Sequence, residues 1–164
     1  MEVIIRKGEE SDLEQVLDLI KELAVYEKAP KEVTNTLAEM REDGFGEKPI
    51  FEMYVAEQND KLVGLALYYL AYSTWKGKTL YLEDLIVSEQ YRRTGIGKRL
   101  FDAVALRARH LKAKRFAWQV LEWNAPAIQF YQKIGAKIDP EWLNCRMTEE
   151  EIAKYTSELK AYQF

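Results

Sequence analysis

Apolar residues alternate with polar ones, or form short unbroken runs, in three neighbouring stretches of this chain. The stretches cover residues 51–57, 62–72 and 80–87, and each is rich in apolar and aromatic side chains. The first two are separated by Gln58-Asn59-Asp60-Lys61, which is typical of a tight hairpin turn, and the third follows a turn at 75–78. The pattern predicts three antiparallel strands that follow one another along the chain.

Elsewhere the apolar residues recur every three or four positions, which is the period of a helix that buries one face. This period predicts helices at 13–24, 34–42, 96–111 and 124–134. Ser11 and Glu14 have the spacing of a capping box at the start of the first helix. The remaining elements are short: strands at 3–6, 116–121 and 143–148, and a last helix that begins at Thr148.

The predicted order, β-α-α-β-β-β-α-β-α-β, describes an α/β fold with a mixed, mostly antiparallel sheet flanked by helices. The segment 80–121 forms a strand, a helix and a strand, so its two strands are expected to be parallel and joined by a right-handed crossover. Ligands in such sheets bind at the carboxyl ends of the strands. With 164 residues, 48% of them apolar, the chain suits one domain that covers residues 1–164.

The joint between the strand at 80–87 and the next helix carries the pattern R-x-x-G-x-G, filled by Arg92, Gly95 and Gly97. A helix N-terminus has unpaired backbone N–H groups, and glycines there let the backbone approach an anion. The pattern lacks the Lys-Ser or Lys-Thr end of a Walker loop and the third glycine of a dinucleotide fingerprint. It predicts a pyrophosphate site, with an ordinary glycine turn at a helix start as the alternative.

Glu83 and Asp84 lie inside an otherwise apolar strand, where burial of two carboxylates is unfavourable unless charges or hydrogen bonds compensate. They could bind and deprotonate an amine, which has a pKa of about 10.4 and is protonated at neutral pH. Glu83 is the candidate base and Asp84 the anchor of the cation. The alternative is a structural pair satisfied by an arginine or a backbone N–H. A regular strand would point only one of the two into a pocket, unless a bulge intervenes.

Tyr131 is a second candidate for the chemistry. Asn124 is a good N-cap and Pro126 is tolerated in a first turn, so Tyr131 lies about two turns into the helix, on the same side as Ala127. A tyrosine hydroxyl can act as a weak general acid, which is sufficient for a leaving group such as a thiolate, whose thiol has a pKa of about 8.5. The alternative is that Tyr131 belongs to the core.

The overall charge argues against nucleic acid as a partner. The formal net charge is −3 and the pI about 5.4, so the surface has no basic footprint and suits cationic small molecules. The single cysteine, Cys145, cannot form an intramolecular disulfide, and the single histidine, His110, supports neither a metal site nor a Ser-His-Asp triad. Without a signal-like leader or an apolar run of membrane-spanning length, we expect a cytoplasmic protein with no metal and no membrane partner.

Several short motifs follow one another along almost the whole chain: Ile20-Lys21-Glu22-Leu23-Ala24 with Tyr26-Glu27, Asp43-Gly44-Phe45-Gly46, Tyr68-Tyr69, Trp75-Lys76-Gly77, Tyr81-Leu82-Glu83-Asp84, Tyr91-Arg92 with Gly95-Ile96-Gly97, Glu122-Trp123-Asn124, and Phe130-Tyr131 with Gly135-Ala136. In this order they resemble the GNAT superfamily of N-acetyltransferases. The resemblance is to the branch that contains the spermidine/spermine (diamine) and thialysine N-acetyltransferases.

The resemblance implies a fold with a central splayed pair of parallel strands, acetyl-CoA as co-substrate and direct attack by a primary amine in a ternary complex. It implies a homodimer. The residues that it implies for the cofactor are Leu85, Ile86, Val87, Arg93, Thr94, Gly95, Ile96, Gly97, Lys98, Asn124, Ala127 and Tyr131. Those for the amine are Tyr26, Glu27, Glu83 and Asp84, bordered by Ala117, Trp118 and Gln119. The catalytic residues are Tyr131 as general acid and Glu83 as base.

Two stretches, 73–77 and 120–121, look more like the thialysine-acetylating members than the polyamine-acetylating ones, which favours a lysine-like amino acid or a short diamine. Arg93 stands where the family often has Gly and adds a positive charge to the pyrophosphate loop. Around 139–142 the chain is shorter than its relatives, so no substrate contact is carried over there.

Two other functions remain open at this point. One is acetylation of a peptide or protein amine on the same fold, which would need an open groove. The other is a regulatory module that binds acyl-CoA without catalysis. The carboxylates favour a small cation over a peptide, and the presence of Glu83 and Tyr131 counts against a module without catalysis.

Overall fold

The computed structural model describes residues 2–157 and 159, and the chain divides into two compact units, Met1–Gln119 and Val120–Phe164. The first unit contains β1 (Ile4–Lys7), η1 (Glu10–Asp12), α1 (Leu13–Tyr26), α2 (Leu37–Phe45), β2 (Glu52–Gln58), β3 (Lys61–Ser73), β4 (Gly77–Val87), η2 (Glu89–Tyr91), α3 (Ile96–His110) and β5 (Arg115–Ala117). The second contains α4 (Ala125–Lys133) and α5 (Glu149–Thr156). The single domain expected over residues 1–164 stays a prediction.

The sheet of the first unit has the strand order β1-β2-β3-β4-β5. Neighbouring strands are antiparallel except β4 and β5, which are parallel and joined through α3. The predicted run of three antiparallel strands and the strand–helix–strand segment are therefore confirmed. Between β2 and β3, Asn59 and Asp60 have φ values of 52° and 59°, as a type I′ hairpin turn requires, and Asn and Asp tolerate this conformation.

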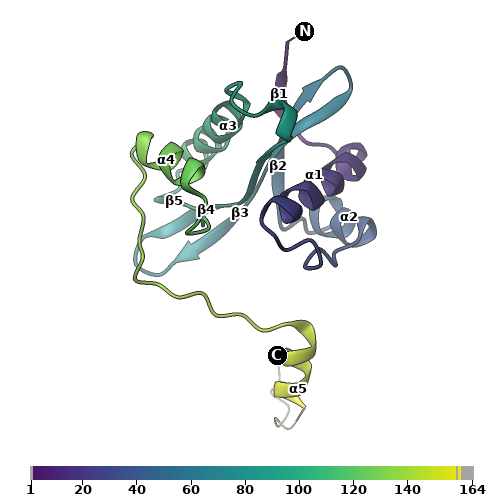
Figure 1. Ribbon diagram of the computed structural model, residues 1–164. Helices are drawn as coiled ribbons and strands as arrows, with labels where there is room; N and C mark the ends of the chain where they lie inside the picture. The colour runs from purple at the N-terminus through teal and green to yellow at the C-terminus, as the bar shows by residue number, and fades with distance from the viewer. Residues whose placement is uncertain (1, 158, 160–164) are drawn as a thin grey trace. The chain divides into compact units, whose positions relative to one another are not determined.

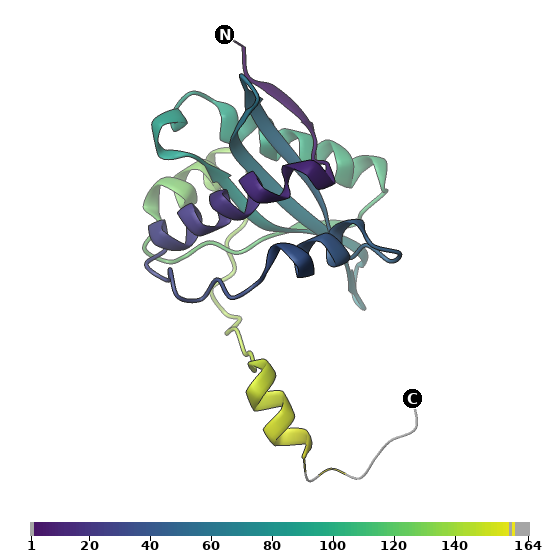
Figure 2. The ribbon, with the colours of Figure 1, turned by 90° about the vertical axis from the view of Figure 1, so that its right-hand side faces the viewer.

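Helices α1 and α2 cover one face of the sheet and α3 covers the other (Figures 1 and 2). The core under α1 and α2 draws on both helices and on three strands: Leu13, Val16, Leu19, Met40, Met53, Val55, Leu62, Leu65, Leu67 and Ile86. On the other face, a Cβ on Gly64 would lie 2.9 Å from Cδ1 of Leu100. The same Cβ would lie 3.0 Å from the carbonyl oxygen of Ile86, so glycine in β3 allows α3 and β4 to pack closely here.

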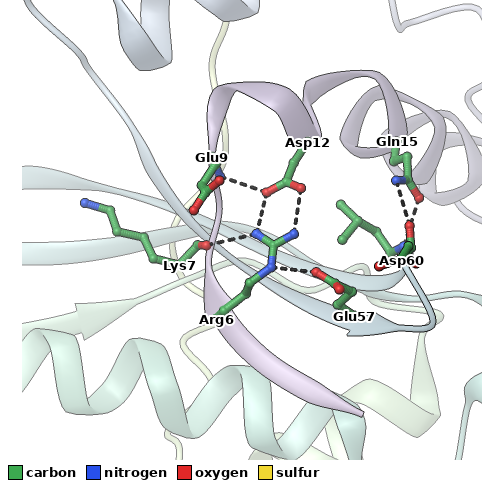
Figure 3. A network of polar contacts seen from close by, with 8 residues as sticks. Arg6, Lys7, Glu9, Asp12, Gln15, Glu57 and Asp60 are labelled. Carbon is green, nitrogen blue, oxygen red and sulfur yellow. Dashed lines mark hydrogen bonds and ion pairs between the residues drawn. The ribbon is translucent and has the colours of Figure 1, made fainter. Parts of the chain in front are cut away.

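A charged network joins β1 to β2 and to the start of α1 (Figure 3). The Arg6 guanidinium donates to both carboxylate oxygens of Asp12, at 2.7 and 2.8 Å, and to Glu57 at 2.6 Å. Although Asp12 is buried, these bonds hold the pKa of its carboxyl below the usual range. One cation thus neutralises two carboxylates from different elements.

The first helix begins differently from the prediction. The expected capping box of Ser11 and Glu14 is wrong, because the short helix η1 precedes α1 and moves the cap towards the N-terminus. The capping box instead joins Glu9 and Asp12, and the backbone N–H of Glu9 donates to Asp12 at 2.8 Å. Asp12 therefore serves both the cap and the Arg6 network.

The second unit confirms two predicted helix starts. Asn124 is the N-cap of α4, and its Oδ1 accepts the N–H of Ala127 at 3.4 Å. A capping box of Thr148 and Glu151 starts α5. Within residues 2–157 and 159, no helix has the length and apolar character needed to cross a membrane.

Two strand predictions fail in whole or in part. The strand at 143–148 is wrong: these residues form no strand, and Leu143 is 88% exposed. The strand at 116–121 is shortened to β5, which ends at Ala117. An apolar run becomes a strand only where another strand pairs with its backbone, and sequence periodicity does not reveal whether such an edge is present.

Replacement of Arg6 by Met should lower the free energy of unfolding at pH 7 by about 2–3 kcal/mol, because it leaves two carboxylates without their cation. The loss should shrink as the pH falls through the lowered pKa of Asp12, since the protonated carboxyl no longer needs a positive partner. Urea unfolding followed by circular dichroism at pH 7 and at about pH 3 measures both effects.

Arg41→Met is the matched control. Arg41 pairs with Glu10 at 2.8 Å, but both side chains are about half exposed, at 53% and 54%. Arg41→Met should lower the free energy of unfolding by less than about 1 kcal/mol. Equal losses in the two variants would mean that the Arg6 network stabilises the fold no more than a surface ion pair does.

Candidate active site

Helix α3 begins at an N-terminus that its own side chains leave uncapped. Its N-cap, Gly95, has φ 84°, in the left-handed region, and the first turn holds no acidic side chain. The N–H groups of Ile96, Gly97 and Lys98 lie in this turn, where the helix offers them no acceptor. By contrast, α2 and α5 both start with a Thr–Glu capping box. The start of α3 is therefore suited to bind an anion.

The two glycines of this loop serve different purposes. Gly95 provides the positive φ, and a Cβ there would meet no atom within 4 Å. At Gly97 a Cβ would lie 3.6 Å from Cγ2 of Val87, which is an ordinary contact. The packing of the protein therefore leaves room for a side chain at position 97. A ligand that approached the backbone beside Val87 would need this room, and only glycine leaves it open. These residues fit a pyrophosphate-bearing cofactor.

The loop that enters α3 adds a positive charge at its rim. Arg93 is exposed and has φ 64°, a conformation that favours glycine and costs other residues about 1–2 kcal/mol. The Thr94 hydroxyl donates to the carbonyl oxygen of Tyr91 and stabilises the turn. Lys98 is exposed and pairs with Asp102 at 2.6 Å. Of the six residues predicted for the pyrophosphate, 93–95 thus lie in the loop that enters α3 and 96–98 in its first turn.

The strand β4 continues beyond its pairing with β5. Its ladder to β5 covers Thr79, Leu80 and Tyr81, whereas its ladder to β3 continues to Val87. The parallel ladder therefore ends at Tyr81, where β5 ends, and a splayed pair stays a prediction. Leu85, Ile86 and Val87 lie on this last stretch of β4, where an extended ligand could pair with the backbone.

A β-bulge lies at the acidic pair of β4. Leu67 pairs with Asp84, but the next residue, Tyr68, pairs with Leu82, so Glu83 is an extra residue in the strand. Because of this bulge, Glu83 and Asp84 need not point to opposite faces of the sheet. Glu83 is exposed, and Asp84 is half-buried.

Asp84, at this bulge, lies within electrostatic reach of two other carboxylates, Glu83 and Glu27. Burial raises the pKa of Asp84 to about 6, and the negative charges of Glu83 and Glu27 add to the shift. Burial also raises the pKa of Glu27, the C-cap of α1. We call Glu27, Glu83 and Asp84 the acidic cluster. The sequence favoured Glu83 as the base, whereas the raised pKa favours Asp84.

Two tyrosines stand beside Glu83, and sequence reasoning assigned neither to the site. The Tyr69 hydroxyl donates to Glu83 at 3.2 Å, and the rings of Tyr69 and Tyr81 lie 5.3 Å apart. Burial, followed by the charge of Glu83, raises the pKa of Tyr69 to about 12 and also raises that of Tyr81. Tyr81 precedes Glu83 by two residues in the strand, a spacing that could have revealed their common side.

Tyr26 lies against the pyrophosphate loop. The Arg92 guanidinium carbon is 4.6 Å from the centre of the Tyr26 ring, within the range of a cation–π contact. Arg92 Nε also donates to the carbonyl oxygen of Val87 at 3.1 Å. The end of α1 therefore contacts the loop through Tyr26 and lies within electrostatic reach of Asp84 through Glu27.

The three residues predicted to border the amine occupy different surroundings. Ala117 pairs with Tyr81 in the parallel ladder, close to the acidic cluster in the sheet. The Trp118 ring packs edge-on against Phe101 of α3, with centroids 5.1 Å apart. Gln119 is exposed. Ala117 thus stands nearest to the cluster in the strand register.

In the second unit, the residues of α4 predicted for the site share one side of the helix. Asn124, Ala127 and Tyr131 are spaced by three and four positions. Tyr131 is only 8% exposed, and burial raises the pKa of its hydroxyl to about 12. The hydroxyl therefore keeps its proton across the physiological pH range, as a proton donor must.

Comparison with known proteins gives consistent matches. The family model described as Acetyltransferase (GNAT) family matches residues 13–136. A thialysine N-epsilon-acetyltransferase of Sus scrofa is 41% identical over 143 residues, which cover 82% of this chain and 84% of that protein. Spermidine/spermine N(1)-acetyltransferase-like protein 1 of Homo sapiens is 35% identical over 158 residues, which cover 90% of this chain and 23% of that protein.

Solved structures show the same fold at low sequence identity. The aminoglycoside N-acetyltransferase AAC(6')-Iy, solved in complex with CoA, has a TM-score of 0.71 and 17% identity to this chain. The match covers 89% of this chain and 95% of that one.

Asp84→Asn should increase the free energy of unfolding at pH 8 by about 2–3 kcal/mol. The fold raises the pKa of Asp84 from 3.8 to about 6, so the native protein favours the protonated carboxyl. The wild type then loses stability as the pH rises between these two values, and the neutral amide escapes this loss. Urea unfolding at about pH 4 and at about pH 8 should show a gain only at the higher pH.

Asp18→Asn provides the control, because Asp18 is an exposed carboxylate on α1. It should change the stability by less than about 0.5 kcal/mol at both pH values. A gain for Asp84→Asn that is the same at both pH values would contradict a buried, ionised Asp84.

Proposed function

This chain belongs to the acetyltransferase (GNAT) family and is an N-acetyltransferase, and from this premise we propose its substrate and the roles of its residues. We propose that it transfers an acetyl group from acetyl-CoA to the primary amine of a lysine-like amino acid of the thialysine type, or of a short diamine. Attack by the amine is direct, within a ternary complex.

The acidic cluster carries this proposal. Glu27 and Glu83 both repel the ionised Asp84, and their charges add to the rise of its pKa. An ammonium group placed among them would relieve the repulsion and regain the attraction of three negative charges. The cluster therefore supports a small cationic substrate.

Asp84 is our proposed base, with Glu83 and Glu27 as the residues that hold the cation. Because its pKa is about 6, Asp84 is ionised at pH 7 and can take the ammonium proton, directly or through one water. The neutral nitrogen then forms the C–N bond as the C–S bond of the thioester breaks. The departing thiolate takes a proton from Tyr131, our proposed general acid on the family resemblance, which is protonated at neutral pH because its pKa is about 12. The second proton that the nitrogen loses as the amide forms returns to the tyrosinate through water, and Asp84 releases its own proton to solvent.

The cofactor is proposed to lie along the end of β4, with its pantetheine arm paired to the backbone of Leu85–Val87. The short β4–β5 ladder supports this position. The pyrophosphate is assigned to the N–H groups of 93–98, which is supported by the uncapped start of α3 and by the space that a Cβ at Gly97 would fill. Asn124 and Ala127 are proposed cofactor residues on the family resemblance.

The choice of a small amine over a peptide rests on two observations. The acidic cluster concentrates negative charge at one point, which suits an ammonium group more than an extended peptide. In addition, the Sus scrofa relative, matched over 84% of its length, is named for thialysine. Tyr26 and Ala117–Gln119 are proposed to border this amine.

We further propose a cytoplasmic homodimer without a nucleic-acid partner. The homodimer is proposed on the family resemblance. The pI of about 5.4 agrees with the absence of nucleic acid.

A panel of amines tests the function. With acetyl-CoA, the purified protein should acetylate thialysine with a kcat/KM at least about tenfold above that for a lysine-containing peptide. Thiol release gives the rate, and mass spectrometry identifies the product for thialysine, lysine, putrescine, spermidine and the peptide. A preference for the peptide would support acetylation of peptide or protein amines instead. Tight CoA binding without acetylation of any amine would support the regulatory module.

The pH profile tests the base. The kcat/KM for thialysine should fall below about pH 6 as Asp84 becomes protonated. Glu83→Gln should move this fall to lower pH, because it removes one of the charges that raise the pKa of Asp84. Asp84→Asn should lower kcat/KM by about 100-fold or more and abolish the fall.

Tyr131→Phe is the comparison variant for that profile. It should lower kcat without moving the acidic fall, because the tyrosine keeps its proton throughout this range. A fall near pH 6 that persists in Asp84→Asn would assign the base to another group.

A further inference from the structure

Glu22, on α1, holds the start of the loop that leads to the pyrophosphate site. Its Oε2 accepts a hydrogen bond from the Ser88 hydroxyl at 2.7 Å, and its Oε1 accepts one from the backbone N–H of Glu89 at 2.8 Å. Ser88 is buried directly after β4, and Glu89 opens η2. The side chain of Ser88 does not cap η2, so a carboxylate from another helix does so instead.

The other end of η2 meets the same side of α1. Nη2 of Arg92 lies 4.0 Å from Oε1 of Glu22, and its guanidinium stacks over Tyr26, one helical turn after Glu22. Only Arg93 and Thr94 separate Arg92 from Gly95, the N-cap of α3. The position of Arg92 therefore limits where the first N–H groups of α3 can lie.

The negative charge of Glu22 and its hydrogen bonds have opposite effects on cofactor binding. A carboxylate beside a pyrophosphate site repels the ligand, so by charge alone the loss of Glu22 would strengthen cofactor binding. Its hydrogen bonds act in the other direction, because they hold the loop in one conformation and reduce the entropy lost when the ligand binds. The two effects have opposite signs, so a measured affinity distinguishes them.

We infer that Glu22 is a positioning residue for the cofactor, which fixes the loop 88–92 so that the N–H groups of α3 face the pyrophosphate before it binds. This inference rests on the proposed function, since it takes CoA as the ligand of this loop. Glu22 acts through Ser88, Glu89 and Arg92 and touches neither the amine nor the reacting atoms.

Two variants at Glu22 test the inference. Glu22→Met removes the acceptors but keeps the length of the side chain, so the cavity of about 570 Å³ that Glu22 lines is not enlarged. It should raise the Kd for CoA on the order of tenfold. Glu22→Gln keeps an acceptor for the Glu89 N–H and gains an amide that can donate to Ser88, so it should raise the Kd only about threefold. Isothermal titration with CoA measures both.

Asp18→Asn is the matched control. Asp18 lies one turn before Glu22 on α1 and lines the same cavity, so this variant removes a negative charge without touching the loop bonds. It should leave the Kd for CoA unchanged or slightly lower. Ser88→Ala removes one of the bonds from its other end, and combined with Glu22→Met it should weaken binding little further, because the two residues act together.

Two readouts separate positioning from a merely structural role. In Glu22→Met the KM for acetyl-CoA should rise in step with the Kd, while kcat at saturating acetyl-CoA and the KM for thialysine change less than about twofold. Hydrogen exchange at the Glu89 amide should become at least about tenfold faster in the protein without cofactor, while the amides of β3 keep their rates.

The outcomes are distinct. Unchanged or tighter CoA binding in Glu22→Met overturns the inference and leaves the proposed function intact. Exchange that accelerates equally in β3 and at Glu89 also overturns it, because the residue would then stabilise the whole fold. A wild-type protein that fails to bind CoA overturns both the inference and the proposed function.

Discussion

The site depends on how β4 ends. This strand pairs with β3 along its length, but it leaves β5 after Tyr81 and continues to Val87. After η2 and the loop that follows it, the chain enters α3, whose first N–H groups have no acceptor within the helix. Backbone polar groups at such an edge need a partner. An extended ligand with an anionic end matches both needs, which is the form of the cofactor we propose.

Negative charge at the bulge of β4 and positive charge at the start of α3 lie close together along the chain. At the bulge, Asp84 is surrounded by negative charge, whereas three residues later the strand leads into a loop with Arg92, Arg93 and a positive helix end. A cationic amine and an anionic cofactor would therefore be drawn to adjacent but different points. The bulge makes this possible, because it puts an extra residue, Glu83, into the strand just before Asp84.

The buried Asp12 and the half-buried Asp84 show the difference between stability and activity. Asp12 accepts two bonds from Arg6, and its pKa is lowered. The groups that shift Asp84 through their charge are both negative, and its pKa is raised. The first carboxylate stabilises the fold, while the second is held at an energetic cost. Such a cost is common at sites whose chemistry needs a poised acid or base.

Sequence reasoning succeeded where local chemistry decides the structure. Asn59 and Asp60 specify their turn, and Gly95 specifies the start of α3, so the hairpin and the loop could be predicted. It failed where a distant partner decides. The run 143–148 has the composition of a strand but pairs with no other strand in the described residues. The preference for Asp84 over Glu83 as the base came from burial and from Glu27 on another element, which no spacing within β4 reveals.

The resemblance assigned Tyr26 and Glu27, at the end of α1, to the amine. The contact of α1 with the loop before α3 was hidden, because it joins residues more than sixty positions apart in sequence, such as Glu22 and Ser88. As a helix, α1 presents Glu22 and Tyr26 to the pyrophosphate loop and ends at Glu27, within electrostatic reach of Asp84. A rigid element that contacts two sites can couple them only if its position changes the free energy of both. The hydrogen bonds of Glu22 supply that link at the loop, and the charge of Glu27 supplies it at the acidic cluster.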